Sequence, residues 1–395
     1  MSRPSPALAL VFSSVGHVFA HLLMLLYPTV VLALTDVFAM PYGELLALAT
    51  PGFIAFGAGA LPAGWLGDRW SASGMLTVFF VGSGTAAVLT GLARTPVEIA
   101  LGLTLIGLFA SIYHPVGIAW VVRHATRRGR ALGINGMAGN IGVAAAALVA
   151  GGLADLVSWR AAFLVPGAVA IAVGVAFALA TRGEQAPRAE GGGGSAEAAG
   201  RATIARGLAV LLVAALCGGL IFQANTVGLP KVFDERLPNL AGGIAGVGAM
   251  VSIVFALAGL AQVIVGTLMD RIDNRKLFVA VYLAQAPLLL VAAVLWDLPL
   301  LLVAIAFVFL NVGAQPVSDG LIARFTPPAW RARAYGTKFM VALGVSALGV
   351  PMVGVIHDLS GGFAWLYAVL AGLALVVTVA GLFLPAGRRP AIAAE

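Results

Sequence analysis

Charged residues are scarce in this chain of 395 residues: Asp, Glu, Lys and Arg together make up 10%, whereas 61% of the residues are hydrophobic. A soluble domain has about a quarter charged residues, because water must solvate its surface. The composition therefore excludes a soluble globular protein. It indicates an integral membrane protein, in which lipid solvates the apolar side chains.

Cysteine is nearly absent, since Cys217 is the only one. A single thiol excludes an intrachain disulfide and a cage of thiolates around a metal ion. The sequence has no G-x-x-x-x-G-K-[ST] phosphate-binding loop, which argues against transport driven by ATP hydrolysis. The net charge of +7 is scattered over helix ends, so we expect no nucleic-acid partner, and we expect no cofactor.

Long apolar runs are abundant, and each has the roughly 20 residues that a helix needs to cross a bilayer. The twelve runs span residues 8–34, 43–66, 74–93, 97–122, 131–154, 160–181, 207–230, 244–268, 277–297, 299–324, 333–357 and 362–385. None alternates over about ten residues as a barrel strand does. The sequence therefore predicts an all-α membrane protein with twelve transmembrane helices.

The positive charges predict the topology. If the N-terminus is cytosolic, all but four of the 23 Lys and Arg residues lie on the cytosolic side. The four exceptions are Arg94, Arg160, Lys231 and Arg236. This bias follows the positive-inside rule and predicts two cytosolic termini, in the inner membrane of a bacterium.

One hydrophilic stretch, residues 182–206, divides the runs six and six. It contains the Gly-rich segment 191–195 together with charges of both signs, a composition typical of a flexible linker. We expect an N-terminal six-helix bundle over residues 1–181, a cytosolic linker over 182–206 and a C-terminal six-helix bundle over 207–395.

The two halves repeat each other at nearly one offset. The segment 64–69 (GWLGDR) matches 266–271 (GTLMDR) at an offset of 202. Three further pairs keep the same order, with offsets of 201 to 203: Pro115-Val116 with Pro316-Val317, Arg130 to Gly133 with Arg333 to Gly336, and Asp155-Leu156 with Asp358-Leu359. A parallel repeat of six-helix halves is typical of a secondary transporter.

The segment Gly64 to Arg69 resembles the G-x-L-x-D-R signature of the major facilitator superfamily. The resemblance implies two pseudo-symmetric six-helix bundles that rock about a central site. It also implies that loop acids and bases latch the cytosolic ends of the halves. The gating residues expected on this basis are Gly64, Asp68, Arg69, Gly266, Asp270, Arg271 and Lys338.

Helices 4 and 5 resemble the fosmidomycin-resistance branch of this family. The residues that carry this resemblance are Gly107, the segment Ser111 to Pro115, the segment Gly139 to Gly142, and the Tyr27-Pro28 pair. The branch implies export of a small molecule.

Three histidines are the strongest candidates for a site inside the membrane. His17 and His21 are four residues apart and lie on one face of helix 1, with His17 about 15 Å deep. His114 on helix 4 lies about 12 Å from the same surface. In the fold that the chain resembles, helices 1 and 4 line the central cavity, so the three imidazoles, with Tyr27 and Tyr113, can face one space. They bind a proton or an anionic substrate, or they are polar packing residues.

The second half offers fewer candidates. Gln315 is the repeat counterpart of His114, and Gln223 and Asn225 lie on helix 7; all three form hydrogen bonds either with a substrate or between helices. Asp319 and Lys338 form a structural ion pair, or Asp319 accepts a proton. The expected site for substrate and protons therefore comprises His17, His21, Tyr27, Tyr113, His114, Gln223, Asn225, Gln315 and Asp319.

These observations favour a monomeric, proton-coupled secondary transporter that exports a small polar or amphipathic organic solute. One alternative is a symporter that imports an organic anion. Another is a transporter of a transition metal or metal chelate, because His17 and His21 have the i, i+4 spacing of metal ligands and His114 supplies a third nitrogen. A membrane enzyme that uses the histidines with a bound metal is the alternative from another class.

Overall fold

The computed structural model describes residues 5–182, 201–269, 271–326, 342, 344, 345 and 347–385. All regular structure in these residues is helical, and eleven helical segments are long and apolar enough to cross a membrane. The all-α membrane fold predicted from the apolar runs is confirmed. The first part of the run at 333–357 falls outside the described residues, as do most of the 182–206 linker, Asp270 and Lys338.

The first half of the chain forms six spans, some of them built from more than one helix. Its elements are α1 (Pro6–Leu25), α2 (Tyr27–Phe38), α3 (Tyr42–Ala47), α4 (Thr50–Arg69), α5 (Ala72–Gly91), α6 (Pro96–Ala110), the π-helix η1 (Tyr113–Gly117), α7 (Ile118–His124), α8 (Arg128–Leu156) and α9 (Ala161–Ala180).

The second half has longer, less interrupted helices. Its elements are α10 (Arg201–Arg236), α11 (Gly243–Met269), α12 (Asn274–Ala292), α13 (Asp297–Phe325), α15 (Gly349–Ser360) and α16 (Ala364–Leu382).

Proline sets the breaks within the first half. Pro28 lies in the first turn of α2 and Pro51 in the first turn of α4, where a missing amide hydrogen costs no helical bond. Pro115 lies inside the fourth span, where it cannot donate to the carbonyl of the preceding turn. The chain widens there into the π-helix η1, which places Tyr113 and His114 at an irregular point of the helix.

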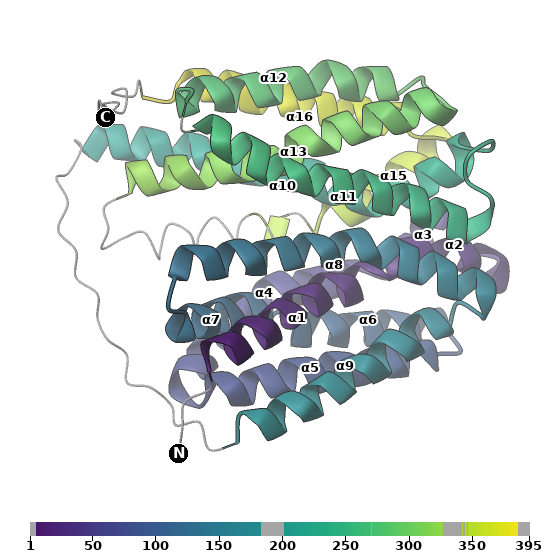
Figure 1. Ribbon diagram of the computed structural model, residues 1–395. Helices are drawn as coiled ribbons and strands as arrows, with labels where there is room; N and C mark the ends of the chain where they lie inside the picture. The colour runs from purple at the N-terminus through teal and green to yellow at the C-terminus, as the bar shows by residue number, and fades with distance from the viewer. Residues whose placement is uncertain are drawn as a thin grey trace.

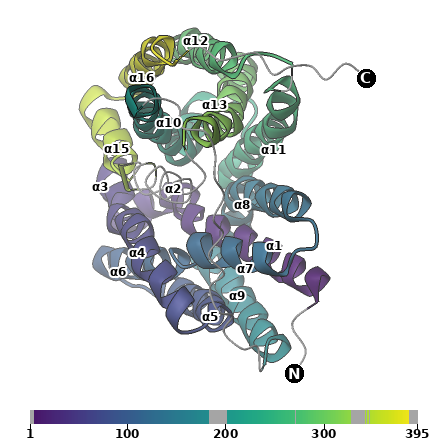
Figure 2. The same ribbon diagram turned by 90° about the vertical axis from the view of Figure 1, so that its left-hand side faces the viewer.

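The helices form two groups that lie side by side (Figures 1 and 2). Helices α1 to α9 make the lower group in Figure 1, and α10 to α16 make the upper one. The start of α1 and the end of α16 lie on the same side of the molecule. The groups touch through α8 with α11 and through α3 with α15. The apolar core is continuous from one group to the other.

Glycine allows the closest helix contacts, as between α4 and α6. A Cβ atom on Gly52 would lie 2.6 Å from the carbonyl oxygen of Leu103, and one on Gly107 would collide with the carbonyl of Gly52. Backbone atoms cannot move aside as a flexible side chain can. Small residues at this interface are therefore required by the packing, as is common between membrane helices.

Gly107→Ala is expected to destabilise the protein by about 1–3 kcal/mol, because the added methyl group overlaps the backbone of Gly52. Gly133→Ala on α8 is the matched control, since nothing lies within 4 Å of a Cβ atom there. Thermal unfolding in detergent measures both. Equal melting temperatures for the two variants would contradict the packing argument.

Candidate functional site

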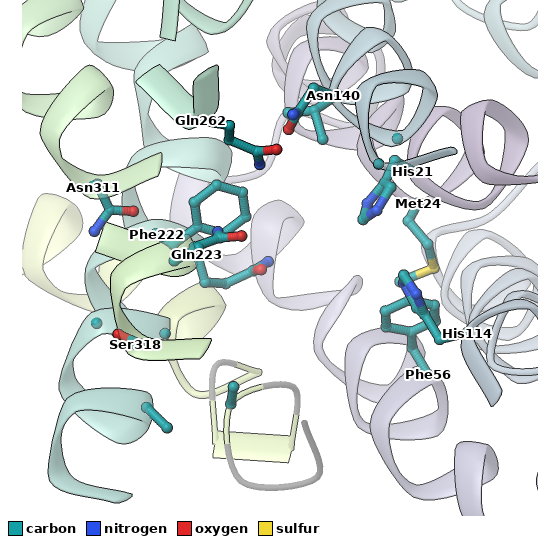
Figure 3. Close-up of a pocket in the computed structure, with 18 of the residues that line it drawn as sticks. His21, Met24, Phe56, His114, Asn140, Phe222, Gln223, Gln262, Asn311 and Ser318 are labelled. Atoms are coloured by element: carbon teal, nitrogen blue, oxygen red, sulfur yellow. The ribbon is translucent and has the colours of Figure 1, made fainter. Parts of the chain in front are cut away.

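A cavity of about 320 Å³ lies between the two groups of helices, within the range of small-molecule sites. Figure 3 shows its two walls, with His21, Met24, Phe56 and His114 on one side and Phe222, Gln223 and Asn311 on the other. The first wall comes from α1, α4, η1, α7 and α8, and the second from α10, α11, α12 and α13.

Three imidazoles cluster on the first wall. Nitrogen atoms of His17, His21 and His114 all lie within 4.8 Å of one another, and the Nε2 atoms of His17 and His21 are 3.3 Å apart. The ring centroids form a nearly equilateral triangle, with sides of 5.1, 5.3 and 5.4 Å. The structure thus brings together the three histidines that the sequence singled out.

Asn135 on α8 fixes the orientation of His17. The Nδ1 atom of His17 lies 2.8 Å from the backbone carbonyl of Asn135 and 3.0 Å from its side-chain oxygen. Both oxygens accept, so Nδ1 carries the hydrogen in the neutral ring and donates it. The lone pair of Nε2 then faces His21.

Tyr113 and Ser13 hold Asn135 in place. The Asn135 Nδ2 atom donates to the Tyr113 hydroxyl at 2.7 Å and to the Ser13 hydroxyl at 3.0 Å. The Tyr113 hydroxyl donates to the Ser13 carbonyl at 2.7 Å, and the Tyr113 ring stacks on His17 with 4.9 Å between centroids. This buried network links α1, η1 and α8 and leaves His17 one orientation.

The glycines of α8 explain how an imidazole fits there. A Cβ atom on Gly139 would lie 2.6 Å from the His17 ring, and one on Gly142 would collide with the backbone of Val18. Gly117 in η1 likewise leaves room for the Tyr113 ring, since a Cβ atom would lie 2.6 Å from it. These residues are small because the histidine site occupies the space.

The second wall is lined by neutral hydrogen-bonding groups. Those that line it are Gln223, Gln262, Tyr282, Asn311, Gln315 and Ser318. The cavity-lining residues that the structure describes include no Asp, Glu, Lys or Arg. The site therefore combines imidazoles, which can bind a proton, with amides that can donate to or accept from a polar solute.

The sequence matches the model of the Major Facilitator Superfamily over residues 12–251 and again over 239–394. The chain belongs to the major facilitator superfamily. It is therefore a secondary transporter of a small molecule across a lipid bilayer, and it is not an enzyme. No curated protein sequence matches the chain significantly.

Solved structures share the major facilitator fold at low sequence identity. A bacterial homologue of the human lysosomal transporter Spinster, inward-facing and unoccupied, matches with a TM-score of 0.76 at 14% identity, over 97% of this chain and 95% of that one. The occupied form of that homologue matches with a TM-score of 0.75 at 17% identity, over 97% of this chain and 95% of that one. A D-xylose–proton symporter matches with a TM-score of 0.72 at 16% identity, over 95% of this chain and 97% of that one.

In this transporter, five of the nine expected site residues line the cavity: His17, His21, His114, Gln223 and Gln315. Tyr113 lies behind His17. Tyr27 is fully buried elsewhere and donates to the carbonyl of Leu45 at 2.6 Å. Asn225 donates to the carbonyl of Ile221 at 2.8 Å, and Asp319 lies outside the lining.

Several polar residues of the site were not predicted from the sequence. They are Ser13, Asn135, Asn140, Gln262, Asn311 and Ser318. Asn140 belongs to the segment that resembles the fosmidomycin-resistance branch, and Asn135 lies five residues before it on α8. Both asparagines are polar residues on a helix that is otherwise apolar and rich in glycine, and this contrast is the feature of the sequence that could have identified them as site residues.

The residues expected to gate the first half lie at the exposed end of α4. Asp68 is exposed, and the guanidinium of Arg69 lies 4.4 Å from the centre of the Trp65 ring. A Cβ atom on Gly64 would lie 3.2 Å from Pro115, so this glycine lets α4 approach η1. In the corresponding segment of the second half, a Cβ atom added to Gly266 would have no neighbour within 4 Å, and Arg271 is exposed.

The two halves are joined at the opposite end of the molecule by a pair of related contacts. The Gly43 amide of α3 donates to both carboxylate oxygens of Asp358 at the end of α15, at 3.2 and 3.0 Å. The Ala245 amide of α11 donates to Asp155 at the end of α8, at 2.6 Å. Asp155 and Asp358 are repeat counterparts. We call the region of these four residues the contact end (right in Figure 1).

Proposed function

We propose that this transporter is a proton-coupled exporter of a small polar or amphipathic organic solute. It works as a monomer in a bacterial inner membrane, with both termini in the cytosol. The observation that carries the proposal is the cavity between the halves, where three imidazoles face a wall of neutral amides. The six-helix boundaries at residues 181 and 207 are part of the same proposal.

The proposed orientation places the contact end outside and opens the cavity to the cytosol. Two lines support it: the positive charges gather at the side of the termini, and two of the similar structures are inward-facing. The exposed Asp68 and Arg69 are then free to latch the cytosolic ends in the alternate state, together with Asp270, Arg271 and Lys338.

Export is favoured by the resemblance to the fosmidomycin-resistance branch in the Gly107 to Pro115 segment and in Gly139 to Gly142. The similar D-xylose–proton symporter supports the alternative, in which proton and solute move in the same direction. Both alternatives use one cavity and one proton gradient. They differ only in how the site is loaded: in symport it carries protons and solute at the same time, and in export by antiport it carries them alternately.

Flux in reconstituted vesicles tests the proposal. A screen of organic anions, amphipathic drugs and polyols by thermal stabilisation first selects a solute, because a specific ligand raises the melting temperature with its occupancy. An imposed pH gradient is expected to drive this solute against the direction of proton movement. Movement with the protons would establish symport. A solute flux that does not depend on the pH gradient would contradict proton coupling.

A further inference from the structure

We propose that His17, His21 and His114 form a binding site for a divalent transition-metal ion of the Zn²⁺ class, with a fourth coordination position open to the cavity. The ion is cargo, and it travels as a complex with an organic anion. The inference deepens the proposed function by naming the class of solute, and it rests on that function only for transport, not for binding.

The spacing of the imidazole nitrogens fits one ion. Two nitrogens that bind tetrahedral Zn²⁺ at about 2.0–2.1 Å are about 3.3 Å apart. The Nε2 atoms of His17 and His21 are separated by 3.3 Å. The nitrogen of His114 lies within 4.8 Å of both, so a small rotation of its side chain completes a set of three ligands.

The surroundings of His17 match those of a metal-binding histidine. Such a histidine donates its second ring nitrogen to a carbonyl or carboxylate, which fixes the tautomer and aims the lone pair at the metal. Here Nδ1 of His17 donates to Asn135, and the stacked Tyr113 ring holds the plane of the imidazole. The lone pair of Nε2 points toward the other two histidines.

Charge decides what fills the fourth position. Three neutral imidazoles leave the ion with its full double charge in a partly apolar cavity, which is costly without a negative partner. The described lining of the cavity has no carboxylate to supply one. An organic anion bound to the ion neutralises it, and the amides of Gln223 and Asn311 on the opposite wall can hydrogen-bond to that anion.

Binding of the metal alone to the purified full-length chain tests the site, in detergent at about pH 7.5, where free imidazoles are neutral. Any polyhistidine tag is removed first. Competition with a coloured chelator is expected to show one Zn²⁺ per chain, and Mg²⁺ is not expected to compete, because it prefers oxygen ligands. His21→Gln and His114→Gln should each weaken Zn²⁺ binding by at least about tenfold.

His124→Gln is the matched control, since this residue does not line the cavity, and it should keep wild-type affinity. A symmetric elution profile and an unchanged melting temperature without metal show that each variant is folded. Equal Zn²⁺ affinity in the cluster variants and in His124→Gln would overturn the site, as would the absence of stoichiometric binding.

Co²⁺ reports on the open position, because tetrahedral Co²⁺ absorbs visible light and its spectrum changes when a ligand is exchanged. Added acetate is expected to shift the spectrum of the bound ion; an unchanged spectrum would overturn the open position. A protein that binds no Zn²⁺ but keeps pH-driven solute flux refutes this inference alone. One that binds Zn²⁺ but shows no gradient-driven flux refutes the proposed function, and with it the transport of the ion, but not the binding site.

Discussion

Replacing His114 or His17 with glutamine is expected to remove the dependence of transport on pH between about 5.5 and 7.5, where imidazole titrates. Glutamine keeps hydrogen-bonding capacity but cannot bind a proton. Gradient-driven flux of the selected solute should fall by at least about tenfold, because each proton that enters the cycle needs an imidazole. The flux of each variant is measured against pH in reconstituted vesicles.

No other group near the cluster replaces the imidazoles. The titratable side chains that face the three histidines in the described structure are Tyr113 and Tyr282, neither of which binds an additional proton in this range. His124→Gln is the control, because its Nδ1 lies 2.8 Å from the carbonyl of Trp120, away from the cavity. A wild-type pH profile in both cluster variants would show that the transported proton binds to another residue, with Asp319 the next candidate.

Asp155→Asn and Asp358→Asn are expected to shift the transporter toward the state that is open at the contact end. Each carboxylate accepts from a backbone amide of the opposite half at the start of a span, where negative charge is favourable. Because the side chain of Asp155 is exposed and that of Asp358 is partly exposed, we expect about 1 kcal/mol from each, or about a fivefold change in the ratio of states. The two sites are independent, so the double variant should show about the product of both changes.

Asp68→Asn is expected to act in the opposite direction, because we propose that Asp68 latches the other end of the molecule. Distances between spin labels on the two halves, at each end of the molecule, measure the populations after the buried Cys217 has been replaced. Glu44→Gln on α3 is the control, since it removes an exposed carboxylate beside Gly43. Changes of the same sign for Asp68→Asn and Asp155→Asn would refute the two-ended latch.

His357 strengthens the contact end on one side only. Its Nδ1 lies 3.0 Å from Asp358 and its Nε2 lies 2.8 Å from Glu235. Carboxylate oxygens only accept, so both nitrogens donate when the ring is charged. Asp155 has no such neighbour in the described structure, which makes the two contacts related by the repeat but unequal in charge.

The spans and the fold were determined by the sequence alone, because a bilayer demands about 20 apolar residues from every helix that crosses it. The i, i+4 spacing likewise places His17 and His21 on one face of the first helix, whatever packs against it. The repeat identified Asp155 and Asp358 as counterparts. Each of these conclusions depends only on the geometry of a single helix or on the comparison of the two half-sequences.

Only the tertiary structure decided which side chains meet. The rotation of each helix about its own axis is set by packing against its neighbours, and this turned Tyr27 and Asn225 away from the cavity toward backbone carbonyls. Asn135 acquired its place beside His17 because glycines let α8 approach α1 closely. The partners of Asp155 and Asp358 lie in the opposite half, since the helix ends that they cap are adjacent only after the two bundles dock.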